Sequence, residues 1–433
     1  MFINDLGNLI ESIFKKPADI LDYQQLKLKE LFSGLKGNAR IMVLSMPAFS
    51  FPQAWFYFYQ PLFFLTVGIK EGELGLFTSL AIGSQVVGQL IGPFFINKFG
   101  HKNTLNTVGL IAWPAGLLLL GFAQNIWWII PGVIFSNIVF MTTPAWSCLF
   151  VEGSTSRGRR NNYAIVQMII SGAALTMPIA GQMVKWLDVN LATRIFFIFG
   201  AVSAAWAALY RQKHLTETKE GKAAVLEYRG LNVAREVRDF VTAFKDFGRK
   251  KDLFWFIIVQ VLFTFGLTMW GVYNAVFLCS SKGGVGLEKS EISIFPILMS
   301  ITFIFTVLVL IPLIKKSETK KYILAGIILN AAAVFLYVIT PNKGMSFIAV
   351  SYLLFGLGVA FFRPLSDSSI MNLLSETKRV RLLSLSNTLV LLVSLAAGPV
   401  SMALYLISPA LNFLAVTVIF MAAALILWKK CRL

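Results

Sequence analysis

The sequence predicts an all-α polytopic membrane protein with twelve transmembrane helices in two six-helix bundles. Of its 433 residues, 57% are apolar and only 14% are charged, whereas soluble domains contain about 25% charged residues. The apolar residues form runs of about 20 residues, long enough as helices to cross roughly 30 Å of hydrocarbon. Polar segments separate these runs into six before and six after one long polar linker, which sets the division into two bundles.

The apolar runs define the spans in order: 41–67, 74–96, 104–124, 127–150, 163–184 and 192–210, then 253–279, 292–314, 321–340, 346–372, 381–406 and 409–428. The expected organisation is a cytoplasmic N-terminal amphipathic segment (1–40), an N-terminal bundle (41–210), a cytoplasmic linker (211–252), a C-terminal bundle (253–428) and a cytoplasmic tail (429–433). Apolar residues at helical spacing in 2–14 and 237–247 predict helices on the cytoplasmic face, the first either in the membrane surface or packed on the protein.

The basic residues predict the orientation. With both termini in the cytoplasm, 32 of the 39 Lys and Arg residues lie on the cytoplasmic side and only six in outer loops, as the positive-inside rule requires. This placement accounts for most of the net charge of +18 without nucleic acid as a partner, and it suits anionic lipids on that face. The short loops favour a bacterial plasma (inner) membrane, and we expect a monomer.

The three cysteines and two histidines exclude several kinds of site. Cys148, Cys279 and Cys431 are far apart in the sequence, so they predict neither a disulfide framework nor a metal site. No predicted span contains histidine, which excludes a histidine proton relay. We therefore expect no prosthetic group or metal.

The two halves match each other in parallel. Pro144 matches Pro364 at an offset of 220 residues, and Glu73 matches Glu291 at an offset of 218. Transporters are often built from such duplicated bundles.

With these features, the chain from about Ile41 to Trp428 resembles the major facilitator superfamily. Its segment Asn97–Lys102, Asn-Lys-Phe-Gly-His-Lys, is similar to the family's Asp-Arg-x-Gly-Arg-Lys loop, although Asn97 replaces the acidic residue that helps to latch the cytoplasmic gate. The resemblance implies gate residues at Asn97, Lys98, Gly100 and Lys102. A second, looser similarity to the antiporter motif lies in Gly172-x5-Pro178-x2-Gly181.

Charged residues within or beside the spans are the first candidates for coupling, because intramembrane charge is costly. Arg363 and Asp367 are four residues apart and so share one helical face. They form either a proton or cation site or a static ion pair that holds the inner gate. Glu152 precedes Arg157, Arg159 and Arg160; these residues form either a breakable cytoplasmic gate or an ordinary solvated helix end.

Aromatic and amide side chains supply a candidate cavity, which would suit an apolar pocket with few polar groups. Its residues are Gln53, Trp55, Tyr57, Gln60, Asn137, Trp270, Tyr273 and Asn274. The alternatives are an outer aromatic belt for Tyr273 and interhelical hydrogen bonding for Asn137.

The predicted function is secondary transport of a small organic solute by alternating access. Aromatic-rich, charge-poor spans favour export of amphipathic or drug-like compounds coupled to protons or another cation. Uptake or facilitated transport of a small polar metabolite, by symport or uniport, is the alternative. An enzyme acting on lipid-linked substrates is disfavoured, because the sequence has no HExxH motif, no Cys/His cluster and no paired intramembrane carboxylates.

Overall fold

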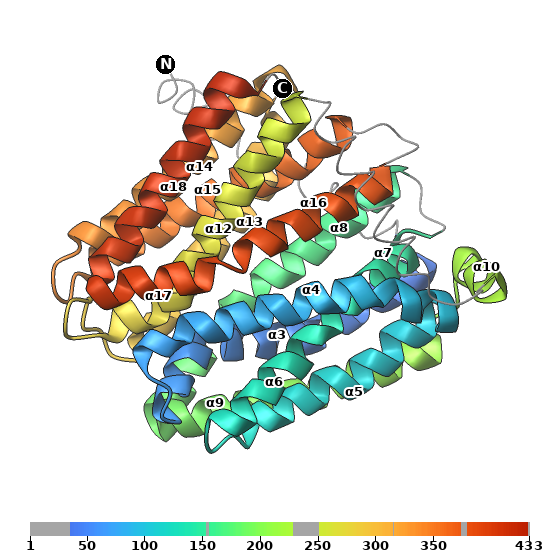
Figure 1. Ribbon diagram of the computed structural model, residues 1–433, viewed down its shortest axis with the longest axis horizontal. Helices are drawn as coiled ribbons and strands as arrows, with labels where there is room; N and C mark the ends of the chain where they lie inside the picture. The colour runs from blue at the N-terminus through green and yellow to red at the C-terminus, as the bar shows by residue number, and fades with distance from the viewer. Residues whose placement is uncertain (1–34, 153–155, 228–250, 315, 374–378, 432–433) are drawn as a thin grey trace, which may run out of the picture.

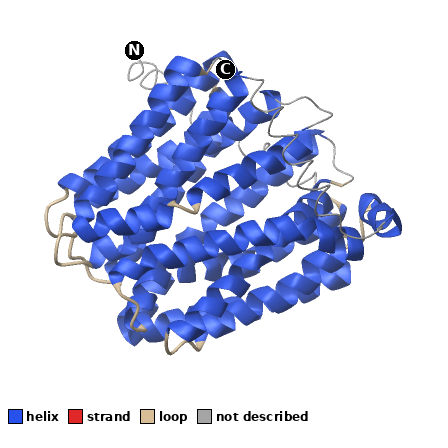
Figure 2. Ribbon diagram, in the orientation of Figure 1, coloured by secondary structure: helices blue, strands red, loops and turns tan. Residues whose placement is uncertain are grey.

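The computed structural model describes residues 35–152, 156–227, 251–314, 316–373 and 379–431. Within these ranges all regular secondary structure is helical (Figure 2). The predicted amphipathic helices in 2–14 and 237–247 lie outside the described residues.

The first half of the chain forms these helices: α3 (Gly37–Thr66), α4 (Leu74–Phe99), α5 (His101–Gly121), α6 (Ile126–Ile138), α7 (Thr143–Val151), α8 (Ser156–Gly172) and α9 (Met177–His214). A short helix, α10 (Lys219–Glu227), follows at one edge of the molecule (Figure 1). The second half forms α12 (Lys251–Cys279), α13 (Ile294–Phe305), α14 (Thr319–Ile339), α15 (Met345–Leu373), α16 (Arg379–Ser394), α17 (Ala397–Ile407) and α18 (Pro409–Lys430).

These helices give twelve membrane spans, as the sequence predicts. Ten stretches of the described chain are long and apolar enough to cross a membrane. One of them, Ile165–His214, reverses at Asp188, whose backbone has φ 61° and ψ 163°, and therefore contains two spans. Helix α3 is not among these ten stretches, but with 30 residues it is long enough to form the twelfth.

Three spans change their helical winding in the interior, each just before or at a proline. The segment Val139–Thr142 is a 3-10 turn ahead of Pro144, and Ala173–Thr176 is a 3-10 turn ahead of Pro178. In the eighth span a π-helical turn precedes Pro312. Proline has no N–H to donate to the carbonyl four residues earlier, and its ring displaces that carbonyl, so the regular ladder is interrupted there.

Each half packs around its own interior. Helices α3 and α5 both pack along α9 in the first half, while α14 packs against α15 and α18 in the second. In Figure 1 the first half, blue to green, lies below the second half, yellow to red, and α4 and α17 run side by side where the halves meet. The bundles have two ends. We call the end at Thr66 of α3 and Cys279 of α12 the far end, and the opposite end, at Gly37, His214 and Lys251, the linker end.

Candidate functional site

Two unusually close contacts, each at a glycine, join the halves at the far end. A Cβ atom built on Gly75 of α4 would lie 2.2 Å from the carbonyl oxygen of Gly398 in α17, and one built on Gly398 would lie 2.0 Å from that of Gly75. A Cβ atom on Gly181 of α9 would lie 2.1 Å from Oγ of Ser293. These contacts, which we call the far-end closure, leave no room for a side chain at any of the three glycines.

The internal repeat relates these two contacts to each other. The offset of 218 that aligns the second span with the eighth places Gly75 on Ser293, and a nearly equal offset places Gly181 on Gly398. The far-end closure therefore consists of two copies of one helix–helix contact, each made by one span from each half.

Tyrosine hydroxyls add hydrogen bonds to the far-end closure. The Tyr59 hydroxyl donates to the carbonyl of Lys289 at 3.1 Å, and the Tyr273 hydroxyl donates to the carbonyl of Glu71 at 3.0 Å. The Tyr273 ring also stacks on Tyr405 at 3.8 Å. Tyr273, which the sequence assigned to the cavity, is thus fully buried between the halves at the far end.

The linker end differs from the far end. The hydrogen bonds identified between described residues of the two halves lie at the far end, including that from Ser79 Oγ to Leu395 O at 2.6 Å. Arg363 and Asp367, in the linker-end part of α15, both have exposed side chains. Their helix is held from another side, where Phe362 stacks on Phe263 at 3.6 Å.

The candidate cavity residues of α3 are spread around that helix. The Trp55 indole donates to Thr176 Oγ1 at 2.8 Å and packs edge-on against Phe196. Tyr57 is exposed, while Gln53 and Gln60 are partly buried. The structure therefore brings Gln53 and Tyr57, one turn apart, to one face, and it directs Trp55 into the first bundle.

The amides of the other candidates are engaged within their own halves. The Asn274 side chain donates to the Tyr352 hydroxyl at 2.7 Å and accepts from the Tyr337 hydroxyl at 2.6 Å. Trp270, beside it, stacks on Phe355. In the first half, Asn137 accepts a hydrogen bond from Gln85 at 2.9 Å, the interhelical arrangement that the sequence offered as its alternative.

The candidate gate is organised around a carboxylate that the sequence did not single out. Gly100 has φ 84°, a conformation that favours glycine, and it ends α4 immediately before α5 begins. Glu217 accepts hydrogen bonds from the backbone N–H groups of His101 (3.2 Å) and Lys102 (2.9 Å). A carboxylate at a helix N-terminus satisfies orphan donors and opposes the helix dipole, so Glu217 fastens the start of the linker to α5.

We call the contact of Glu217 with the backbone of His101 and Lys102 the clasp. The remaining gate candidates lie close to this clasp or at the surface. Glu152 accepts a hydrogen bond from the Lys219 backbone N–H at 2.6 Å, where α10 begins. Asn97 and Lys98 are exposed, and the Lys98 ammonium lies 5.1 Å from the Phe99 ring centroid. Helix α8 carries Arg157, Arg159 and Arg160, whose side chains lie outside what the structure describes.

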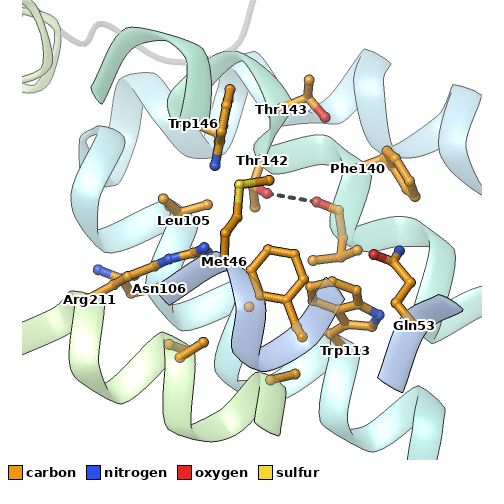
Figure 3. A pocket seen from close by; sticks show the side chains of 16 residues that line it. Met46, Gln53, Leu105, Asn106, Trp113, Phe140, Thr142, Thr143, Trp146 and Arg211 are labelled. Carbon is orange, nitrogen blue, oxygen red and sulfur yellow. Dashed lines mark hydrogen bonds between the residues drawn. The ribbon is translucent and has the colours of Figure 1, made fainter. Parts of the chain in front are cut away.

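One buried cation was not predicted from the sequence. Helix α9 continues four residues beyond the predicted span end at 210, and it buries Arg211 with 7% of its surface exposed. Arg211 lines a cavity of about 220 Å³ inside the first half, together with side chains from α3, α5 and α7 (Figure 3). The signal that could have found it is the spacing of Ala204, Ala207 and Ala208 ahead of it, which continues one helical face.

No group of three or more His, Cys, Asp or Glu side chains suitable for a metal ion occurs among the residues that the structure describes.

Comparison with known families matches residues 41–316 to the model of the major facilitator superfamily. Because this match covers more than half of the chain, the protein belongs to the major facilitator superfamily, a family of transporters and not of enzymes, and is a secondary transporter of a small solute. Comparison with curated protein sequences gave no match.

Solved structures with the same fold are numerous. The nucleoside transporter NupG is 13% identical with a TM-score of 0.67, over 91% of this chain and 98% of that one. The inward open xylose transporter XylE from E. coli is 13% identical with a TM-score of 0.67, over 93% and 96%. A POT family transporter in complex with a thioalcohol conjugated peptide has the same identity and TM-score, over 90% and 94%. At these identities the likeness establishes the fold alone.

Proposed function

We propose that the protein carries a small organic solute by alternating access, and that the described conformation is closed at the far end and open at the linker end. The observation that carries this proposal is the asymmetry of the contacts between halves. The far-end closure is a pair of repeat-related close contacts at glycines, and the identified hydrogen bonds between the halves lie beside it. Rocking of the two halves about a central site would break these contacts and close the other end.

The linker end is the cytoplasmic end in this proposal, because the basic residues favour it. Lys and Arg concentrate in the termini, the linker and the loops of that end, and cytoplasmic loops carry such an excess. The pathway is then closed to the outside and open to the cytoplasm, in a bacterial plasma membrane.

Asp367 and Arg363 are the proposed coupling residues. Both are exposed within a span near the open end, and an intramembrane carboxylate beside a single cation is suited to alternate between protonated and ionised forms. Protonation of Asp367 would free the Arg363 charge, so that proton binding and solute binding are linked.

Export of an amphipathic compound is the proposed direction, and uptake of a polar metabolite is the alternative. The exposed aromatic Tyr57 and the half-buried Gln53 offer one stacking face and few polar groups, which fits a partly apolar solute. The alternative predicts binding of a single polar class instead.

The test uses purified protein in detergent and then in liposomes. A thermal-shift screen of lipophilic cations, sugars, amino acids, nucleosides and organic acids identifies a ligand, because a ligand that binds only the folded state raises the melting temperature. In liposomes with a pH gradient, Asp367→Asn should abolish accumulation of that ligand but retain its exchange at equal concentrations, whereas Glu220→Gln on the exposed α10 should change neither. Unchanged gradient-driven accumulation in Asp367→Asn would refute the coupling role.

A further inference from the structure

The guanidinium of Arg211 is buried without a full set of partners. Its Nε donates to Ser45 Oγ at 2.7 Å, and its Cζ lies 5.0 Å from the Phe49 ring centroid. Its Nη2 has no hydrogen-bond partner. Among the described residues, no carboxylate lies within 4.0 Å of this guanidinium, so its charge is uncompensated there.

The carboxylate of Glu217 in the clasp is not a partner of Arg211. Glu217 lies three residues after the end of α9, and its two carboxylate oxygens accept hydrogen bonds from the backbone N–H groups of His101, Lys102 and Thr218. A buried charge left without a partner is strongly destabilising. Arg211 therefore marks a place where an anion would stabilise the protein.

Two further residues that line the cavity also have unpartnered polar atoms. The Trp113 Nε1 donor and the Asn106 Oδ1 acceptor are both buried and unpaired, and both residues line the cavity with Arg211. The orientation of the Asn106 amide is set by its Nδ2, which donates to Gln212 at 3.0 Å. Figure 3 shows the Arg211 guanidinium and the Trp113 indole on opposite sides of the space beneath Trp146.

The remaining walls are mostly apolar and aromatic, with polar side chains from Gln53, Thr142 and Thr143. Four aromatic rings line the cavity: those of Phe49, Trp113, Phe140 and Trp146. On the side of α9 the wall is formed by three alanines, whose small side chains leave space. The volume of about 220 Å³ equals the share of about seven liquid waters, enough for one substituted ring or a short aliphatic chain. Thr143, which also lines the cavity, is exposed, so the space reaches the surface of α7.

We propose that this cavity binds a small organic monoanion, whose carboxylate or sulfonate pairs with Arg211 and whose apolar part lies against the aromatic walls. One guanidinium flanked by rings favours a single charge on an apolar body over a fully polar oxyanion such as phosphate, which would leave most of its oxygens facing hydrocarbon. The free Trp113 N–H supplies a second donor, and Asn106 Oδ1 accepts from a substituent. Identifying this anion as the transported solute rests on the proposed function, which the cavity itself does not require.

The binding test uses the full chain in detergent and isothermal calorimetry. The probes are benzoate and benzenesulfonate, each paired with its uncharged amide of nearly the same shape. We expect the anions to bind and the amides to bind at least about 10-fold more weakly, because hydrogen bonds between charged partners are about twice as strong as neutral ones. Equal binding of each anion and its amide, or no binding of the anions, would overturn the proposal.

Variants assign the binding to the cavity. Arg211→Gln should weaken anion binding at least about 10-fold, and Arg211→Lys should retain part of it. Arg40→Gln, which removes an exposed arginine of α3, is the matched control and should bind as the wild type does. If Arg211→Gln does not fold, Trp113→Phe removes an unpaired donor and part of one aromatic wall and should weaken binding several-fold; unchanged affinity in the folded variants contradicts the site.

Two further experiments test whether the ligand is an organic monoanion, inorganic phosphate or a lipid headgroup, and whether it is transported. Inorganic phosphate and anionic phosphatidylglycerol micelles, tested as competitors of benzenesulfonate, should displace it poorly; efficient displacement by either would overturn the assignment to an organic monoanion. Labelled benzenesulfonate, which stays ionised, is then tested for counterflow in liposomes. Binding without counterflow would reject the anion as cargo and leave the site standing, whereas counterflow that survives Arg211→Gln would separate transport from this cavity.

Discussion

Replacing Gly75 by alanine tests whether the far-end closure depends on direct backbone contact. The new Cβ would lie 2.2 Å from the Gly398 oxygen, whereas ordinary contact begins near 3.4 Å, so α4 and α17 must separate locally by about 1.2 Å. Overpacking of this kind costs about 1–3 kcal/mol. If the cost falls only on the closed state, the ratio of closed to open far ends decreases by about 5- to 140-fold.

The matched control lies on the same helix. At Gly83 a Cβ atom would meet only Leu395 Cδ1, at 3.7 Å, so Gly83→Ala carries the same change in helix propensity without the overlap. Gly398→Ala, with its Cβ 2.0 Å from the Gly75 oxygen, should reproduce the effect from the other half.

The assay is an electron–electron distance measurement between spin labels at the exposed residues Lys70 and Lys282, in a background without the three natural cysteines. We expect Gly75→Ala and Gly398→Ala to move the distance distribution to longer values and Gly83→Ala to leave it unchanged. Identical distributions in all three variants would show that the closure yields without cost, and an equal shift in Gly83→Ala would assign the effect to the helix itself.

Three other predictions concern the clasp, a buried network and a thiol. Glu217→Ala should lower the melting temperature, because it removes a cap worth about 1–2 kcal/mol from the start of α5, whereas Glu220→Ala should not; equal melting temperatures would show that the cap does not contribute. Asn274→Leu should cost about 1–3 kcal/mol by leaving the Tyr337 hydroxyl without its acceptor, and adding Tyr337→Phe should recover part of that loss in thermal unfolding; a further loss would contradict the hydrogen-bond account. Burial raises the pKa of the Cys431 thiol to about 11, and since the thiolate is the reactive form, iodoacetamide should modify it about 100-fold faster at pH 10 than at pH 8 in a Cys148→Ser, Cys279→Ser background; a rise of only about 10-fold, which an ordinary thiol pKa of 9.0 gives, would refute the shift.

The spans were predictable because their cause is local composition. A run of about 20 apolar residues must be helical in hydrocarbon, where backbone polar groups have no water to bind. The interruptions at Val139–Thr142 and Thr306–Leu310 were not predicted. A proline shows only that the ladder breaks, and packing against the neighbouring helices selects 3-10 or π winding.

The residues that organise the interior were harder to predict. Glu217 and His101 are 116 residues apart, and nothing in either local pattern indicates their contact. Arg211 was assigned to the linker because Gln212, Lys213 and His214 follow it, and a hydropathy boundary averages over such neighbours. Asn274 was rightly singled out as a buried amide, but whether its partners are a solute or two tyrosines depends on helices that lie 63 and 78 residues away.

The interrupted spans have a mechanical consequence. The fourth and fifth spans are each two stiff rods joined by a turn whose hydrogen bonds already depart from the α pattern, and the eighth span departs from that pattern over its last part, Thr306–Leu310 and Ile311–Leu313. Bending at such a joint breaks fewer bonds than bending a regular helix. The linker-end rods can therefore swing inward while the far-end rods stay in place, which would enclose a solute in an occluded intermediate before either end of the molecule opens again.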